Sequence, residues 1–370
     1  MSQHILDLLH ASGPRRMLSL DGGGIRGVVT LEILARMEAL LRSHYKRDDL
    51  VLSDHYHFIG GTSTGAIIAC GLSLGMPVEE LQRFYFDCAT EMFRRTGWRR
   101  RAHHLYSAKP LREMMKGVFG ADTLLGSERF RSLLLVVTRN AKTDSPWFIT
   151  NNVNAKYNDA SLPDCNLNIP VWQLVRASTA APIFFAAEEI DLGPNQFVFV
   201  DGGMTTYNNP SFLMFLMATL EPYGIRWPSG TDRLLVTSVG TGVTPKLRPM
   251  LNRQRMGMWF NLSTAPAALI FAALVEQDVL CRTFGDCLAG PPIDSELGDL
   301  KGRTGVLENK LFRYARYNVE LTEQSLSEMG LSLSTKEFER AFRLDAIDSI
   351  PLLREIGRRQ ADTVRIEHLH

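Results

Sequence analysis

Ser63 lies in a pattern that suits a nucleophile. The segment GTSTG at residues 61–65 matches G-x-S-x-G, in which a serine occupies a strained turn between a strand and a helix. The apolar run Tyr56–Ile59 precedes it, and a second apolar run follows it. This context predicts an exposed Ser63 hydroxyl at the carboxyl end of a strand. Gly61 and Gly65 would form the nucleophile elbow and let neighbouring backbone pass closely. The alternative is an ordinary turn.

A serine nucleophile needs a base, and the histidines of this chain are poorly placed for that role. In α/β-hydrolases the serine is followed by an acid and then by a histidine. Here no histidine lies between His104 and His368, and the last residues of a chain are prone to fraying. We therefore do not expect a Ser-Asp-His triad in this order.

Asp201 is the best candidate for the base. It follows the apolar run Phe197–Val200 and precedes Gly202 and Gly203. A sharp turn there would leave the carboxylate at the carboxyl end of a strand, where sites of α/β proteins lie. A carboxylate can act as a general base when it is within hydrogen-bond reach of the serine or when burial raises its pKa. The alternative is that Asp201 only begins a DGG turn.

The glycine-rich segment SLDGGGIRG, residues 19–27, has two interpretations. Gly22, Gly24 and Gly27 satisfy G-x-G-x-x-G, which is typical of a dinucleotide-binding turn. Such a site also needs an acidic residue about 20 positions further on, at the end of a second strand. The acidic pair at residues 48–49 has the right distance, but its surroundings, HYKRDDLVLSDHY, do not resemble a strand followed by an acid.

The second interpretation is an oxyanion hole, which we favour. Ester cleavage creates an oxyanion, and each backbone N–H aimed at it contributes roughly 3–4 kcal/mol to transition-state stabilisation. Consecutive glycines allow the N–H groups of Gly22, Gly23 and Gly24 to face one point. The next helix, from about Val28, adds its positive end. Arg26 would lie beside these donors and pair with a substrate phosphate or hold the loop.

Strands that alternate with helices predict an α/β protein with a central, mainly parallel sheet and helices on both faces. The strand candidates are apolar without alternation, as in strands covered on both faces. Strands are expected at Met17–Leu20, Tyr56–Ile59, Leu133–Thr138, Phe197–Val200 and Leu234–Val239. Helices are expected at Val28–Tyr45, Ala66–Leu74, Val78–Arg95, Lys336–Phe342 and Pro351–Arg359. We divide the chain into a catalytic domain, residues 1–245, and a C-terminal helical extension, residues 246–370, that packs on it as a lid or regulatory part.

The composition is that of a globular protein with ample material for a core. Of 370 residues, 45% are apolar and 22% are charged, and the net charge of +1 is too small to indicate a partner. Five scattered cysteines without a C-x-x-C pair argue against a disulfide framework or zinc site and favour a reducing compartment. The N-terminal segment lacks a secretory-signal pattern, so we expect a cytoplasmic location.

DGGGIRG, GTSTG and VDGG, in this order over about Arg16–Thr241, resemble the patatin-like phospholipases. The resemblance implies a three-layer patatin-like fold, a Ser63–Asp201 dyad and an oxyanion hole in the glycine-rich loop. It also implies hydrolysis of an sn-1 or sn-2 acyl ester of a membrane phospholipid, without cofactor or metal. RASTAAPIFF, residues 176–185, also resembles the family and is expected to pack near the dyad without reacting.

The C-terminal part resembles stand-alone bacterial members of the family through residues 274–300 and 311–321. Some of those members are antiviral effectors that cyclic dinucleotides switch on against the cell's own membrane. This implies peripheral membrane association when active, a phospholipid substrate, a cyclic-dinucleotide activator and no nucleic-acid polymer as partner. An unregulated lipase remains open, as does a homo-oligomer. A third alternative is a dinucleotide-binding protein in which GTSTG is structural.

Two further segments have several interpretations. Phe93–His104 holds five arginines and a tryptophan, which suits an anionic membrane surface, an anionic nucleotide or a solvated loop. Leu262–Val275 is the most apolar window, short for a bilayer span and interrupted by polar residues and a proline. It could be a lid, a membrane contact or a buried helix. His55 and His57 alternate but lack a third ligand, so we expect no metal site.

Overall fold

The apolar runs of the sequence form the middle of a sheet. β1 (Arg15–Leu20), β2 (Phe58–Thr62), β3 (Leu133–Asn140) and β7 (Leu234–Val239) run parallel in the order β3-β2-β1-β7. These strands are buried along nearly their whole length, so they need no alternation of polar and apolar residues. The computed structural model describes residues 3–92, 106–182, 184–243, 257–303, 305–334, 337–338 and 346–370.

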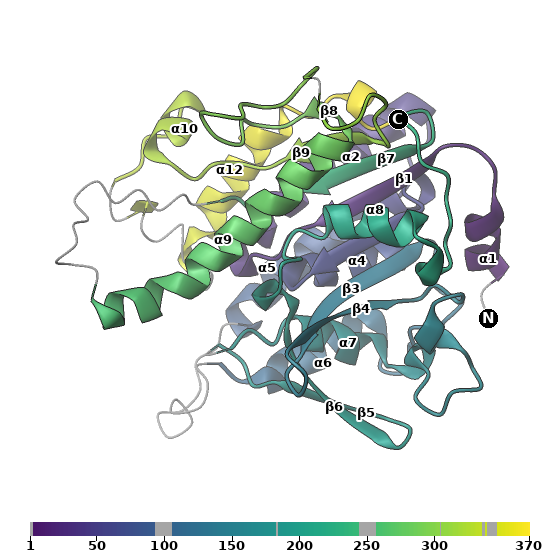
Figure 1. Cartoon of the computed structure of the whole chain (residues 1–370). Helices are drawn as coiled ribbons and strands as arrows, with labels where there is room; N and C mark the ends of the chain where they lie inside the picture. Colours follow the sequence, from purple (N-terminus) through teal and green to yellow (C-terminus); the bar gives the residue numbers. More distant parts are fainter. Residues whose placement is uncertain are drawn as a thin grey trace.

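Shorter strands extend the sheet on both sides. The hydrogen-bonded path through the sheet is β5-β6-β3-β2-β1-β7-β9-β8, and β4 pairs with the edge of β3 opposite to the one that β2 and β6 share. β4 (Ser145–Thr150), β5 (Glu188–Leu192) and β6 (Asn195–Asp201) are antiparallel to their neighbours. β8 (Asp286–Ala289) and β9 (Arg313–Tyr317) continue the parallel part beyond β7. The sheet is therefore mainly parallel with one antiparallel side, as Figure 1 shows.

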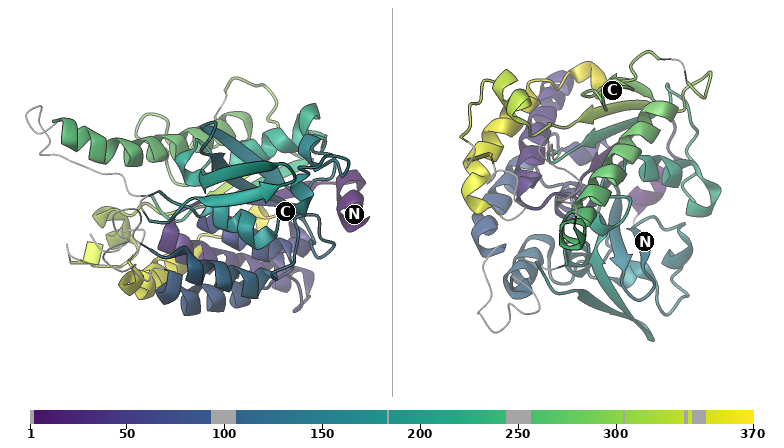
Figure 2. Two further views of the ribbon diagram at one scale, coloured as in Figure 1. Left: turned by 90° about the horizontal axis from the view of Figure 1, so that it is seen from below. Right: turned by 60° about the vertical axis from the view of Figure 1, so that its left-hand side comes forward.

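Helices cover both faces of this sheet and complete the predicted three layers (Figure 2). One face carries α8 (Ser211–Thr219) and α9 (Met258–Phe284). The layer on the other face consists of α2 (Gly27–Tyr45), α4 (Thr64–Ser73), α5 (Val78–Met92), α6 (Ala108–Phe119), α7 (Val171–Ser178) and α12 (Ile350–Ala361). The short helices α1 (Gln3–His10) and α10 (Glu323–Glu328) lie at the periphery. The one-turn helix α3 (Leu52–His55) is largely buried and contacts α4.

The C-terminal region differs from the expected helical extension. It supplies β8 and β9 to the central sheet, in addition to α9, α10 and α12. β9 was not predicted because its sequence, RYARY, contains two arginines and no continuous apolar run. Four of its five residues are nevertheless buried. The division into residues 1–245 and 246–370 stays a prediction, but the second part is not exclusively helical. The expected helix at Lys336–Phe342 lies largely outside the described residues.

The register of three strands brings two chain segments together. β2 pairs with β3 up to Thr62 opposite Val137. β6 runs in the opposite direction and ends with Asp201 opposite Thr138. Since β4 occupies the other edge of β3 at these positions, β2 and β6 share one edge and meet end to end. The residue after β2, Ser63, thus faces the last residue of β6.

The contact between α2 and α12 gives a test of this packing. A Cβ atom at Gly357 of α12 would lie 2.9 Å from the Glu32 Cβ and 3.1 Å from the Val29 Cα, both on α2. We expect Gly357→Ala to lower the free energy of unfolding by about 1–3 kcal/mol, as overpacked cores do. The matched control is Gly117→Ala on α6, where nothing lies within 4 Å, and a gain of about 0.5–1 kcal/mol is expected. Urea unfolding followed by circular dichroism measures both, and equal shifts would contradict the close helix contact.

Candidate active site

Ser63 forms the predicted elbow between β2 and α4. Its backbone has φ +55° and ψ −123°, a left-handed conformation that is strained for a residue with a side chain. The flanking glycines are required sterically. A Cβ at Gly61 would lie 2.2 Å from the Gly65 carbonyl oxygen, and one at Gly65 would lie 2.3 Å from the Leu20 carbonyl oxygen. The turn therefore fits tightly between β1 and the start of α4.

Asp201 lies within hydrogen-bond reach of this serine. The Ser63 hydroxyl donates to Asp201 Oδ2 over 2.7 Å, and the Gly203 N–H donates to Oδ1 over 2.7 Å. The carboxyl is buried, with 5% of the residue exposed. Burial raises the pKa of Asp201 to about 6, although the bonds from Gly203 and Ser63 and the positive charge of Arg176 oppose that rise. A carboxylate with this pKa is a competent base near neutral pH.

The chain around the end of α7 holds both members of this pair. Ser178 Oγ accepts a hydrogen bond from the Ser63 N–H over 2.9 Å and donates to the Val137 carbonyl over 2.7 Å. The carbonyl of Ala180 accepts the N–H of Asp201 over 3.0 Å. The segment lies near the dyad, as its sequence predicts, but the contacts of Ser178 were not predicted. Ser178 is the third residue of the family-like RASTAAPIFF run, and its membership of that run was the one local signal for it.

The glycine-rich loop lies directly beside Ser63. A Cβ at Gly22 would be 3.1 Å from the Ser63 Cβ. The N–H of Gly22 donates to the Asn208 carbonyl, and the N–H of Gly23 donates to Thr64 Oγ1, each over 3.1 Å. In the part of the chain that the structure describes, the N–H of Gly24 has no acceptor. Of the three predicted oxyanion donors, two are thus engaged within the protein in this structure.

Arg26 lies in the same loop and contacts its backbone. Its Nε donates to the Gly23 carbonyl over 3.5 Å, so the side chain helps to hold the loop. Desolvation lowers the pKa of Arg26 to about 10, and the negative charge of Asp21 opposes this. The acidic pair at residues 48–49 follows α2 in a turn, well before β2 begins at Phe58. The loop therefore lacks the strand-end acid that a dinucleotide site needs.

A buried ion pair fixes the residue that precedes the glycines. Asp21 accepts two hydrogen bonds from Arg316 of β9, over 2.8 and 2.5 Å. Arg316 also donates to Ser238 Oγ over 2.7 Å, and both charged side chains are at most 2% exposed. The two residues are 295 positions apart. Sequence reasoning missed this pair because no local pattern links them.

The basic segment, the apolar segment and the expected absence of a metal site were the other features considered from the sequence. Phe93–His104 lies outside the described residues. Leu262–Val275 belongs to α9, and it is not buried core, since Leu269 is 70% exposed. Among the described residues, no helix is long and apolar enough to cross a bilayer. Within the same residues, no group of three or more His, Cys, Asp or Glu side chains could hold a metal ion.

Together, the fold and the site define a three-layer α/β protein with a serine elbow, a buried aspartate and a glycine-rich loop at one point. Residues 18–214 match the family model of the patatin-like phospholipases. The chain belongs to this family.

Several known proteins are similar to this chain. A cGAMP-activated phospholipase of Escherichia coli (strain TW11681) is 33% identical over 220 residues, which cover 57% of this chain and 58% of that protein. A cGAMP-activated phospholipase of Vibrio cholerae is 29% identical, covering 55% and 58%. The mouse 85/88 kDa calcium-independent phospholipase A2 is 28% identical, covering 62% and 28%. Among solved structures, human GIVD cytosolic phospholipase A2 matches with a TM-score of 0.49 at 12% identity, covering 98% of this chain and 61% of that one. The chain thus spans little more than half the length of the first two relatives.

The buried Asp21–Arg316 pair leads to a stability prediction. We expect Arg316→Met to lower the free energy of unfolding by about 3–5 kcal/mol, because it leaves a buried carboxylate without its partner. Adding Asp21→Asn should recover most of this loss. The control is Arg226→Met, which breaks an ion pair with Glu221 whose side chains are both well exposed, and should cost less than about 1 kcal/mol. Urea titration at pH 8 measures all four proteins. A double variant as unstable as Arg316→Met would contradict the electrostatic cause.

Proposed function

We propose that the chain is a serine hydrolase of phospholipase A type, which cleaves carboxylic esters of membrane phospholipids. Ser63 is the nucleophile and Asp201 is the general base. The observation that carries this proposal is the 2.7 Å hydrogen bond between the Ser63 hydroxyl and Asp201 Oδ2, made at a strained elbow. The family membership and the relatives named as phospholipases support the lipid substrate.

The geometry supports a two-step reaction. Asp201 accepts the hydroxyl proton while Ser63 Oγ attacks the ester carbonyl carbon, and a tetrahedral oxyanion forms. The oxyanion collapses, the ester C–O bond breaks, and the proton from Asp201 passes to the leaving lysophospholipid oxygen. Asp201 then takes a proton from water, which attacks the acyl carbon of the acyl-enzyme. The bond between that carbon and Ser63 Oγ breaks, the proton passes from Asp201 to Oγ, and the fatty acid is released. No histidine takes part, because the carboxylate reaches the serine directly.

The oxyanion hole is assigned to the glycine-rich loop. Gly24 offers an N–H without an acceptor among the described residues. The N–H of Gly23 is held by a hydroxyl, Thr64 Oγ1, and a small shift of the loop exchanges that acceptor for the oxyanion. The N–H of Gly22 bonds a backbone carbonyl, which makes it the least available donor. Arg26 steadies the loop through the Gly23 carbonyl.

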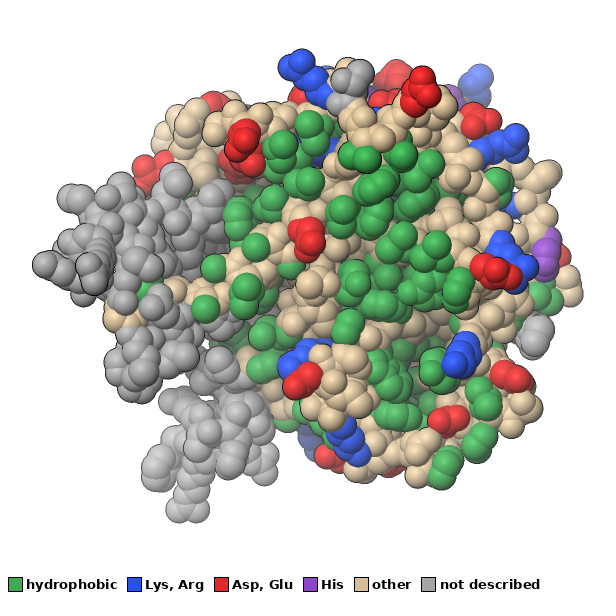
Figure 3. Space-filling view, in the orientation of Figure 1, with side chains coloured by type: hydrophobic (Ala, Val, Ile, Leu, Met, Phe, Trp, Pro, Cys, Tyr) green, Lys and Arg blue, Asp and Glu red, His purple; other side chains and the backbone are tan. Residues whose placement is uncertain are grey.

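Membrane contact is assigned to the exposed side of α9. Leu269 is 70% exposed, and the neighbouring alanines at 267, 268 and 272 are exposed as well. Figure 3 shows hydrophobic side chains gathered along this helix and the adjoining face. In Figures 1 and 2 the first half of α9 extends past the edge of the sheet. An apolar helix face of this kind favours peripheral association with a lipid surface.

A second element of the proposal is activation by a cyclic dinucleotide, which would make the protein an antiviral effector. The two bacterial relatives are named cGAMP-activated phospholipases. The elements after residue 214 lie outside the family-model match. They provide surface for a ligand site that is separate from the Ser63–Asp201 pair. The alternatives are a lipase without an activator and a dinucleotide-binding protein without esterase activity.

Fatty-acid release from mixed phospholipid vesicles tests the proposal. Wild type with cGAMP should release fatty acid and lysophospholipid, and Ser63→Ala should show only the assay background. Asp201→Asn should lower kcat by about 10²–10⁴-fold, the contribution of a general base. Its free energy of unfolding at pH 8 should not fall, because the change removes a buried charge and keeps an oxygen for the Gly203 N–H.

The same assay separates the alternatives. Each protein is run without nucleotide and with a panel of cyclic dinucleotides. Release without nucleotide indicates an unregulated lipase. Release of head group instead of fatty acid, or full activity of Asp201→Asn, would contradict the proposed chemistry. Binding of NAD or FAD without esterase activity would favour the dinucleotide alternative.

The pKa of Asp201 predicts the pH profile. The base must be deprotonated, so kcat/KM should rise tenfold per pH unit below pH 6 and level off above it, with a midpoint near pH 6. A short-chain soluble ester avoids effects of pH on the vesicles, and the rate of Ser63→Ala is subtracted at each pH. A midpoint near 4, the ordinary value for aspartate, would show that burial does not govern this carboxyl.

A further inference from the structure

A polar cavity of about 530 Å³ lies outside the segment that matches the family model. It is formed by β8 and β9, the chain between them, α10, and the residues at and after the end of α12. Its volume falls in the range of small-molecule sites, about 300–1,000 Å³. It is separate from the Ser63–Asp201 pair, neither of which lines it. We propose that this cavity binds the cyclic-dinucleotide activator and transmits its presence to the glycine-rich loop. This inference rests on the proposed activation.

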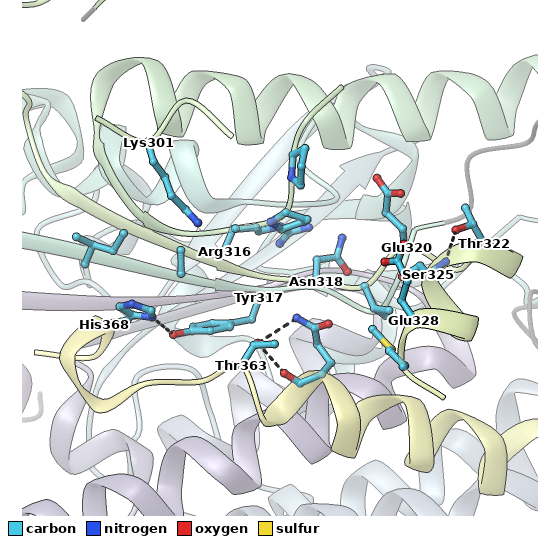
Figure 4. A pocket seen from close by; sticks show the side chains of 18 of the residues that line it. Lys301, Arg316, Tyr317, Asn318, Glu320, Thr322, Ser325, Glu328, Thr363 and His368 are labelled. Carbon is cyan, nitrogen blue, oxygen red and sulfur yellow. Dashed lines mark hydrogen bonds between the residues drawn. The ribbon is translucent and has the colours of Figure 1, made fainter. Parts of the chain in front are cut away.

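The cavity has two chemically different ends, which Figure 4 shows. Lys301 and His368 lie at one end, with Arg316 nearby on the cavity wall. The Lys301 ammonium binds phosphate through charge-assisted hydrogen bonds. Burial lowers the pKa of His368, which favours a neutral imidazole there, and the guanidinium of Arg316 is paired with Asp21. Glu320 and Glu328 lie at the other end.

Both ends match parts of a cyclic dinucleotide. The carboxylates accept hydrogen bonds of the kind that the exocyclic amine of guanine donates. The prolines at 291 and 292 and Met329 add apolar surface for a purine ring. A ligand with phosphates and purines in one compact ring suits both ends, whereas a simple anion would be repelled by the carboxylates.

Two hydrogen-bonded connections run from the cavity wall to the glycine-rich loop. Arg316 lines the cavity and holds Asp21, the residue before Gly22. Asn318 also lines it, and its Oδ1 accepts the N–H of Gly242 over 2.9 Å.

The second connection continues through the neighbour of Gly242. The hydroxyl of Thr241 donates to the carbonyl of Gly22 over 3.1 Å. Both connections therefore end at adjacent residues of the loop beside Ser63.

The opposite wall of the cavity is connected to the C-terminal end of the glycine-rich loop through α12 and α2. Gln360 and Thr363, at and after the end of α12, line the cavity. α12 packs along α2, where Glu32 bonds Arg354 over 2.7 Å, and α2 begins at Gly27, directly after the loop. A ligand that draws β9 and α12 together thus acts on both ends of the glycine-rich loop.

Calorimetric titration of the full-length chain with cGAMP tests the site. Lys301→Glu and the cavity-filling Ser325→Trp should each lower the affinity at least tenfold. Lys109→Glu, the same charge change at an exposed position on α6, should leave it within twofold. Wild-type binding that both cavity variants retain would overturn the site while leaving cyclic-dinucleotide activation standing. Absence of wild-type binding for every cyclic dinucleotide in the panel would overturn the proposed activation together with the site, and the vesicle assay would then report the hydrolase by itself.

The transmission is tested at Thr241, which does not line the cavity. Thr241→Val removes the hydroxyl and nearly preserves the shape of the side chain. We expect cGAMP affinity within threefold of wild type and a stimulated-to-basal activity ratio at least tenfold lower. An unchanged ratio would overturn the connection through Asn318 and Gly242. Loss of cGAMP affinity would show that Thr241 acts on the cavity itself, which also contradicts the proposed role.

Discussion

The reactive geometry depends on the register of two strands that end on one edge of β3. β2 and β6 approach along that edge from opposite directions, and their last residues pair with Val137 and Thr138. A shift of either strand by one residue would move its end by about 3.3 Å and turn its side chains to the other face. The 2.7 Å bond between Ser63 and Asp201 would not survive such a shift. Ser178 secures the register, because it bonds both the Ser63 N–H and the Val137 carbonyl.

Burial then gives the aspartate its chemical character. The end-to-end meeting of the strands places Asp201 inside the protein, where desolvation raises its pKa to about 6. The Gly203 N–H and the Ser63 hydroxyl limit this rise and orient the carboxyl. On the proposed mechanism, a carboxylate that is basic enough near neutral pH and already bonded to the serine makes an imidazole unnecessary. This explains physically why the chain offers a serine elbow without a histidine in the expected position.

The sequence contains the local features of this fold and little of its long-range pairing. GTSTG predicted the elbow at Ser63, and the apolar runs predicted β1, β2, β3, β6 and β7, because turns and buried strands leave signals within a few residues. The direction of β6 was not predictable, since an apolar run reads the same in a parallel and an antiparallel strand. β9 was not predicted because it contains Arg316. This arginine is buried as the ion-pair partner of Asp21, which lies 295 positions away in the sequence. The internal acceptors of the Gly22 and Gly23 N–H groups, Asn208 and Thr64, likewise depend on three-dimensional contacts.

The Asp21–Arg316 pair has a meaning beyond stability. Burying two charges costs desolvation energy, and apolar residues of similar size often stabilise a protein as well or better. What the pair does provide is a directional link between β9 and the residue before the glycines. In this structure the link is formed while the Gly22 and Gly23 N–H groups donate to acceptors within the protein. One oxyanion donor alters a rate by about 10²–10³-fold. On the proposed mechanism, a small displacement of β9 that frees the Gly23 N–H therefore suffices to switch the rate strongly, without any change in the Ser63–Asp201 pair itself.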